Sequence, residues 1–134
     1  MKIPTVQKYM SAVPVTIGID QPMSVAHQLM REHRIRHLPV LAGGRLAGVV
    51  SDRDLHLVET LRDVDPEKVA VEDALSPEPF TVAPETPLDE VVQQMADRKL
   101  GSAVVVRGGR VVGIFTTVDA LHALAELLQR RRAA

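Results

Sequence analysis

Hydrophobic and polar residues follow one another along this chain in short periodic runs, which predict alternating helices and strands. Two segments, residues 24–33 and 88–99, carry apolar side chains three and four positions apart, as one face of an amphipathic helix requires. Short apolar runs bounded by polar residues, which are typical of buried strands, occupy residues 38–41, 46–50, 103–106 and 111–115. The chain is therefore expected to have a mixed α/β fold of the α+β type.

Turn-forming residues predict the order of these elements. Gly43-Gly44 and Gly108-Gly109 each separate two apolar runs, and glycine readily adopts the positive φ of a tight hairpin turn. Before each amphipathic segment, a β-prone run beside proline (Val15–Ile17 and Phe80–Val82) predicts a brief strand. The predicted order is strand, helix, strand, strand and a second helix, and it occurs twice.

The second helix of each set is predicted after the hairpin, over residues 53–61 and 118–129. The residues just before them, Asp52 and Thr117, are of types that favour the N-cap position. Their side-chain oxygens can accept hydrogen bonds from the free backbone N–H groups of a helix start. We therefore expect Asp52 and Thr117 to cap these helices.

The two halves of the chain are copies of one motif. Residues 6–56 align without gaps on residues 71–121, an offset of 65 positions. Identical pairs include Pro14/Pro79, Thr16/Thr81, Met30/Met95, Gly48/Gly113 and Asp54/Asp119. We assign residues 4–62 to the first motif, 63–70 to a linker and 71–128 to the second motif. Because about 60 residues are only marginally stable alone, we expect the motifs to pack sheet to sheet with pseudo-twofold symmetry.

Composition and charge indicate which partners and which location to expect for this protein. Apolar residues make up 46% of the 134 residues, but two Phe, one Tyr and no Trp leave few aromatic side chains to stack on bases. The formal net charge of −1 creates no general attraction to nucleic acids or anionic membranes, and we expect neither as a partner. The sequence has no cysteine and no signal-like or membrane-spanning segment, so we expect a cytoplasmic protein without disulfides.

Each copy ends its second long apolar run with a hydroxyl residue and, three positions later, an aspartate: Ser51 and Asp54, then Thr116 and Asp119. A carboxylate accepts two hydrogen bonds at once, which suits the cis-diol of a ribose, while the free N–H groups of a helix start suit phosphate. The pattern therefore indicates a nucleotide-binding site. The alternative is that these residues only begin helices.

Catalysis and metal binding are not expected. Ser51, His37 and Asp54 could be combined into a triad, but no Gly-x-Ser-x-Gly turn presents the serine. The five histidines follow none of the spacings of metal-binding motifs. We therefore expect a protein that is not an enzyme, has no catalytic cofactor and holds no metal.

The duplicated order and the motifs "GVVSDRDL" (residues 48–55) and "GIFTTVDA" (residues 113–120) resemble the cystathionine-β-synthase (CBS) domain. Two such domains pair into a Bateman module. The segments "MSAVPVTI", "LSPEPFTV" and "IRHLPV" are also similar to that family, and the resemblance covers about residues 4–125. It implies two clefts that bind adenosine compounds such as AMP, ADP, ATP or S-adenosylmethionine.

The resemblance also implies the residues of the clefts, each of which combines the hydroxyl and aspartate of one motif with adenine contacts from the other. The residues implied at ribose and phosphate are Ser51, Asp54, Thr116 and Asp119. Those implied at adenine are Val15, Ile35, Phe80 and Leu100, with Val49 and Ile114 on the opposite walls. The basic residues expected to meet phosphate are Arg36, His37 and Arg53; the alternative for Arg36 and His37 is an exposed pair without a partner.

These implications lead to an expected function. The chain should be a stand-alone regulatory module whose regulatory ligand is an adenine nucleotide. It would signal to an unidentified effector protein or by self-association, and a homodimer through the apolar faces of its helices is expected. The alternative is a protein-interaction or dimerisation module that binds no nucleotide.

Overall fold

The structure is a computed structural model, and it describes residues 2–61 and 63–133. The α-helices are α1 (Met23–His33), α2 (Asp52–Glu59), α3 (Leu88–Arg98) and α4 (Thr117–Ala133), with short 3-10 helices η1 (Val6–Lys8) and η2 (Val71–Asp73). The strands are β1 (Ser11–Ala12), β2 (Ile17–Gly18), β3 (His37–Ala42), β4 (Arg45–Ser51), β5 (Thr81–Val82), β6 (Ser102–Arg107) and β7 (Arg110–Thr116). The predicted mixed α/β fold with two repeated motifs is confirmed.

The chain forms two compact units, each with its own core. The central unit contains residues 14–79 and 109–111, and the C-terminal unit contains residues 1–13, 80–108 and 112–134. The predicted element order is present in both, as β2-α1-β3-β4-α2 and as β5-α3-β6-β7-α4.

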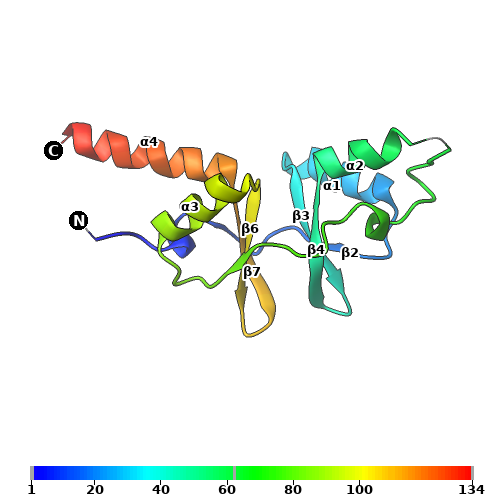
Figure 1. Ribbon diagram of the computed structural model, residues 1–134, viewed down its shortest axis with the longest axis horizontal. Coiled ribbons are helices and arrows are strands. Elements are labelled where there is room, and N and C mark those ends of the chain that lie inside the picture. The colour runs from blue at the N-terminus through cyan, green and yellow to red at the C-terminus, as the bar shows by residue number, and fades with distance from the viewer. Residues whose placement is uncertain (1, 62, 134) are drawn as a thin grey trace. The chain divides into compact units, whose positions relative to one another are not determined.

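The central unit packs its helices on a three-stranded sheet. Strand β2 pairs with β3 in parallel, and β3 pairs with β4 as an antiparallel hairpin. Figure 1 shows α1 and α2 together on one side of this hairpin. The buried side chains of the core include Met23, Ala26 and Met30 from α1, Leu38 and Val50 from the hairpin, and Leu55 from α2. Their spacing on α1 is the one that predicted an amphipathic helix.

The C-terminal unit repeats this arrangement and adds one strand. Its sheet has the order β1-β7-β6-β5, with β5 parallel to β6 and β1 antiparallel to β7. The buried core side chains include Val6, Leu88, Val91, Met95, Phe115 and Ala123. Strand β1 lies far from β7 in the sequence, and the hydrophobic pattern did not predict it.

The segment that opens each motif packs in the unit of the other motif. In the C-terminal unit, the Val6 amide donates to Thr86 O (2.9 Å) and the Leu88 amide donates to Pro4 O (2.9 Å). In the central unit, Val71 and Met23 make the corresponding bonds, to Gln21 O (2.8 Å) and Val69 O (2.9 Å). Val6 and Val71 are fully buried in these positions. Each core is therefore completed by the first residues of the other motif.

The hairpin turn of β3 and β4 has the predicted glycines but also an irregularity that the sequence did not predict. Gly43 and Gly44 have φ values of 57° and 79°, as the tight turn requires. Leu41 pairs with Leu46, whereas Val40 pairs with Gly48, so Ala47 is one extra residue on β4. This bulge shifts the pairing by one residue toward the open end of the hairpin.

Candidate functional site

The end of β4 and the start of α2 carry Ser51 and Asp54 in a reciprocal arrangement. Ser51 has extended backbone dihedrals (φ −108°, ψ 161°), and its Oγ accepts a hydrogen bond from the Asp54 amide (3.0 Å). In return, the Ser51 amide donates to Asp54 Oδ2 (2.9 Å). This is a capping box, in which two free N–H groups of the helix start are satisfied by side chains.

The end of β7 and the start of α4 repeat this arrangement with Thr116 and Asp119. The Thr116 amide donates to Asp119 Oδ2 (2.9 Å), and the Asp119 amide donates to Thr116 Oγ1 (3.3 Å). The Thr116 hydroxyl also donates to Asp119 Oδ2 (3.2 Å), a bond that the Ser51 pair does not show. The duplication thus places a hydroxyl and a carboxylate at the same point of both units.

The predicted caps were wrong by one position. Asp52 and Thr117 are the first helical residues of α2 and α4, while Ser51 and Thr116 accept the capping hydrogen bonds. The Asp52 carboxylate instead lies 3.5 Å from His56 Nδ1, one helical turn later. The reason is that each strand continues through Ser51 or Thr116, so that residue has the extended backbone that an N-cap requires.

The capping role leaves part of each pair available for a ligand. Only Oδ2 of Asp54 and of Asp119 accepts a hydrogen bond from another described residue, so Oδ1 is open in both carboxylates. The Ser51 hydroxyl accepts from Asp54 but donates to no described residue. Both aspartates are half-buried. Each cap can therefore offer a charged acceptor while it holds the helix start.

Arg36 and His37 lie beside the Ser51 cap within the central unit. His37 pairs with Ser51 across the β3–β4 hairpin, and the Asp52 amide donates to Arg36 O (2.9 Å). Burial lowers the pKa of His37 below its usual 6.5; the nearby Asp54 carboxylate opposes this shift and the Arg36 guanidinium adds to it. His37 is therefore less readily protonated than a free histidine, although a bound phosphate would favour its charged form.

This lowered pKa predicts a pH-dependent stability. The unfolded chain, with a His37 pKa near 6.5, binds more protons than the folded chain as the pH falls, so the folded state loses stability below about pH 6.5. Replacing His37 by Gln removes this titrating group and with it the part of the stability that depends on its protonation. Thermal unfolding of both proteins between about pH 7 and pH 5 should show a steeper loss for the wild type. Parallel stability curves would contradict the assignment.

The remaining predicted site residues fall into the unit of their own motif. In the central unit, Val49 is buried in β4, Val15 and Ile35 pack against the core, and Arg53 is exposed on α2. In the C-terminal unit, Ile114 is buried in β7, while Phe80 and Leu100 pack against the core. The pairing of residues from both motifs in one cleft stays a prediction.

Sequence reasoning missed one contact that bears on the site. The Arg98 guanidinium lies over the Phe80 ring, 5.1 Å from its centroid, as in a cation–π interaction. One face of the ring is therefore occupied by the last turn of α3. The sequence signal was weak, because the two residues are far apart along the chain.

Two features that would suggest other functions are absent from the described residues. They contain no group of three or more His, Cys, Asp or Glu side chains that could hold a metal ion. No described helix is both long enough and apolar enough to cross a membrane.

Comparison with known proteins identifies the repeated motif. The family model of the CBS domain matches residues 6–58 and again residues 71–126. The CBS domain-containing protein YhcV of Bacillus subtilis is 28% identical over 115 residues, which are 86% of this chain and 81% of that protein. The inosine-5'-monophosphate dehydrogenase of Korarchaeum cryptofilum is 32% identical over 109 residues, or 81% of this chain. The matched region spans only 22% of the dehydrogenase.

A solved structure with the same fold is the CBS domain pair of protein MJ0100, in complex with 5'-methylthioadenosine and S-adenosyl-L-methionine. Its TM-score is 0.85 at 24% identity, and the match covers 93% of this chain and 98% of that one. The two family matches, together with the two repeated units, show that this chain belongs to the CBS domain family. It carries two CBS motifs in tandem.

Proposed function

We propose that this protein is a regulatory module that binds an adenosine-containing nucleotide through Ser51 and Asp54 in one unit and Thr116 and Asp119 in the other. The observation that carries the proposal is the open Oδ1 of both capping aspartates. A carboxylate oxygen held at the rim of a strand–helix turn is suited to the 2′- and 3′-hydroxyls of a ribose. Most backbone N–H groups at the two helix starts are already hydrogen-bonded within their units, so we assign the phosphate contacts to basic side chains.

The fold that this chain shares with the CBS domain pair of MJ0100 supports adenosine compounds as the ligands to test. The structure of MJ0100 contains two adenosine compounds, and its likeness to this chain is one of fold. Membership of the CBS family supports adenine contacts by Val15, Ile35, Phe80 and Leu100, with Val49 and Ile114 as walls. Arg36, His37 and Arg53 are the proposed phosphate ligands.

The experiment that tests the proposal is a thermal-shift screen of the full chain with AMP, ATP, S-adenosylmethionine and their 2′-deoxy analogues. A ligand at about 100 times its dissociation constant should stabilise the protein by roughly 2.7 kcal/mol. The ribose form should stabilise more than its 2′-deoxy analogue, because the analogue leaves a carboxylate oxygen without its donor. Equal shifts from both forms would contradict ribose recognition, and no shift from any compound would favour the alternative module without nucleotide.

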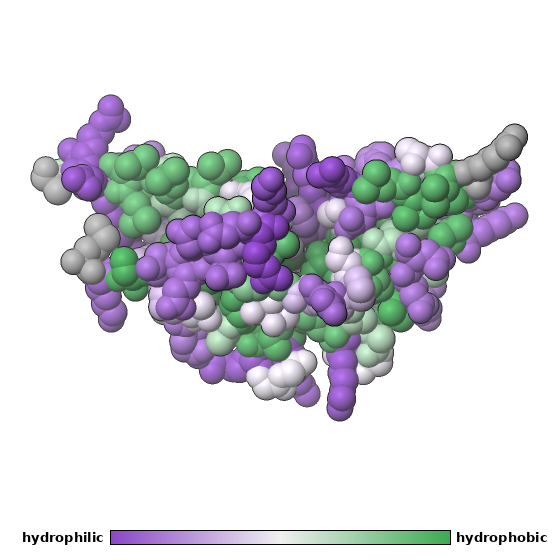
Figure 2. All heavy atoms as spheres, in the orientation of Figure 1, coloured by the Kyte–Doolittle hydropathy of each residue, from purple (hydrophilic) through white to green (hydrophobic). Residues whose placement is uncertain are grey.

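A second candidate function, self-association, rests on exposed apolar side chains along α4. Val118, Leu121, Leu124 and Leu128 are each more than half exposed. They recur every three or four residues, so they share one side of the helix. Figure 2 shows the corresponding hydrophobic surface along α4. A second copy of the chain is the proposed occupant, since an identical apolar stripe can pack against it.

Light scattering should therefore report a species larger than the 14.6 kDa monomer. Replacing Leu121 and Leu124 by Gln should shift the protein toward the monomer, because it places polar groups in the stripe. The matched control is Leu57→Gln on α2, which is also exposed but lies outside the α4 stripe. A monomer at every concentration, with and without nucleotide, would contradict self-association.

A further inference from the structure

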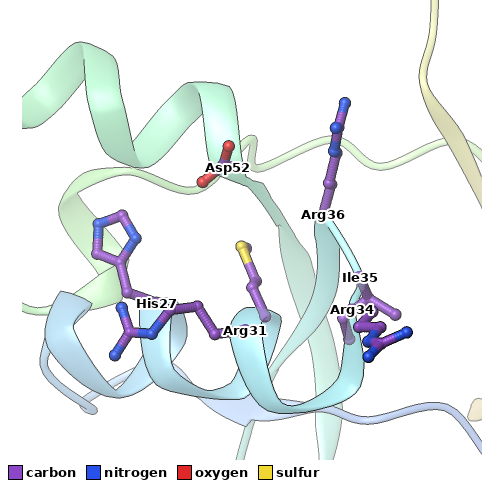
Figure 3. Close-up of a pocket in the computed structure, with 7 residues that line it drawn as sticks. His27, Arg31, Arg34, Ile35, Arg36 and Asp52 are labelled. Carbon is purple, nitrogen blue, oxygen red and sulfur yellow. The ribbon is translucent and has the colours of Figure 1, made fainter.

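A basic groove lies on the helical side of the central unit, where α1 ends and α2 begins. Its volume is about 340 Å³, at the lower end of the range for small-molecule sites. Arg31, Arg34 and Arg36 line it around the apolar side chains of Met30 and Ile35. Figure 3 shows Arg31 projecting from α1 and Arg36 extending past the start of α2.

The arginines of this groove have no anionic partner in the protein. None of the three guanidinium groups forms an ion pair with another described residue. The acidic groups nearby are already engaged: Asp52, which also lines the groove, lies 3.5 Å from His56, and Glu59 accepts from His27 at 2.5 Å. With three guanidinium groups and one carboxylate, that of Asp52, in its lining, the groove carries an excess of positive charge.

The duplication shows that the repeated motif does not require arginine at positions 31 and 36. Positions 31, 34 and 36 correspond to Ala96, Lys99 and Gly101 in the second motif. Helix α3 ends in the same left-handed C-cap conformation as α1 and has the same need for cations near its C-terminus. It meets that need with Arg98 and Lys99. The cation at position 34 is thus kept as Lys99, whereas the arginines at positions 31 and 36 have no basic counterpart and belong to the first motif alone.

We propose that this groove binds a phosphate-class oxyanion, held by Arg31 and Arg34 with Arg36 at its border. A guanidinium group presents a planar pair of donors that fits two phosphate oxygens, and it stays charged at every physiological pH. The site uses two residues that the proposed nucleotide site does not use and needs neither Asp54 nor Asp119. Its ligand can be a free oligophosphate or the phosphate chain of a phosphorylated small molecule.

The test is a calorimetric titration of the full chain with inorganic pyrophosphate at low ionic strength, where exposed charges are least screened. Replacing Arg31 by Gln should weaken binding by about tenfold, as expected for the loss of hydrogen bonds to a charged group. The matched control is Arg45→Gln. It removes the same charge from the turn end of the hairpin, five residues along β3 from the groove and so roughly 15 Å away.

A second variant distinguishes a loss of pyrophosphate binding from a loss of folding stability. Arg34 has a left-handed backbone (φ 55°), so Arg34→Gly relieves the conformational strain of a side chain there while it removes the cation. The melting temperature should rise and the pyrophosphate affinity should fall. A structural role alone would move both in the same direction.

Two further results would overturn the site: no pyrophosphate binding by the wild type, or equal weakening by Arg31→Gln and Arg45→Gln. Titrating ATP into the Asp54→Asn variant distinguishes a free oligophosphate from the phosphate chain of a phosphorylated molecule. Affinity equal to that of pyrophosphate supports a free oligophosphate, and tighter binding that still depends on Arg31 supports a phosphorylated molecule. The groove can be supported in this way even if the proposed ribose recognition fails.

Discussion

Asp54→Ala and Asp119→Ala should each weaken the binding of a ribonucleotide at their own site by about 1.5–3 kcal/mol, or roughly 10- to 150-fold. Each substitution removes the open carboxylate oxygen that is proposed to accept hydrogen bonds from the ribose. The remaining site should stay intact, because the caps lie at separate helix starts, of α2 and α4. Isothermal titration calorimetry with each single variant measures this effect.

The capping role of the same aspartates makes a second pair of variants necessary. Alanine also removes the bond from Asp54 Oδ2 to the Ser51 amide, so the start of α2 would lose stability. Asp54→Asn and Asp119→Asn keep a carbonyl oxygen for that bond but replace the charged oxygen by an amide donor. These variants should melt close to the wild type and still bind the ribonucleotide poorly.

The asparagine variants separate the two interpretations of the repeated aspartate. If they bind as tightly as the wild type, the aspartates serve as helix caps and not as ribose ligands. If they bind weakly while their stability is kept, the open oxygen is the functional group. The alanine variants alone would leave a loss of binding confounded with a loss of the cap.

Gly48→Ala should destabilise the protein by about 2–3 kcal/mol, as overpacking of a well-packed interior does. A Cβ at Gly48 would lie 2.3 Å from Ser76 O and 2.7 Å from a Leu75 methyl group. The Ser76 carbonyl cannot move freely, because it accepts a hydrogen bond from the Val49 amide (3.2 Å), while the Ser76 amide donates to Val49 O (2.9 Å). The glycine that opens "GVVSDRDL" therefore permits close approach of a second backbone.

The matched control is the corresponding glycine of the second motif. A Cβ at Gly113 would meet Met10 Sδ at 2.4 Å, and its nearest neighbours all belong to that flexible side chain. Gly113→Ala should therefore cost less than Gly48→Ala, on the order of 1 kcal/mol. Urea denaturation of both variants measures the difference in the free energy of unfolding. Equal losses would mean that the Ser76 backbone moves as easily as a methionine side chain.

Much of the fold could be predicted from the sequence, because it depends on neighbours in the chain. The 3.6-residue periodicity of α1 and α3 predicted their buried faces, and Gly43-Gly44 predicted the hairpin turn from φ preferences alone. Because the two halves of the sequence align, the elements predicted in one half could also be predicted in the other. The hydroxyl–aspartate pairs were visible for the same reason, since their partners lie three residues apart on one helix start.

The N-cap residue of α2 could not be predicted from the local sequence. Ser51 and Asp52 are both good capping residues, so side-chain type could not decide between them. The N-cap is set by the residue at which β4 ends. That residue depends on how far β4 stays paired with β3. A plain two-residue turn would have placed Val50 opposite His37, but the extra residue Ala47 brings Ser51 there instead.

The sequence by itself determined the repeated elements, their order and the chemistry at the two helix starts. Only the tertiary structure decided which segments complete each core: Val6 packs with α3 of the second motif, and Val71 packs with the core that contains α1. It also placed Arg31, Arg34 and Arg36 around one groove whose lining contains a single carboxylate, that of Asp52. The physical reason is that periodicity and φ preferences act between neighbours in the chain. Strand register, segment exchange and the grouping of charges depend on contacts between residues far apart in sequence.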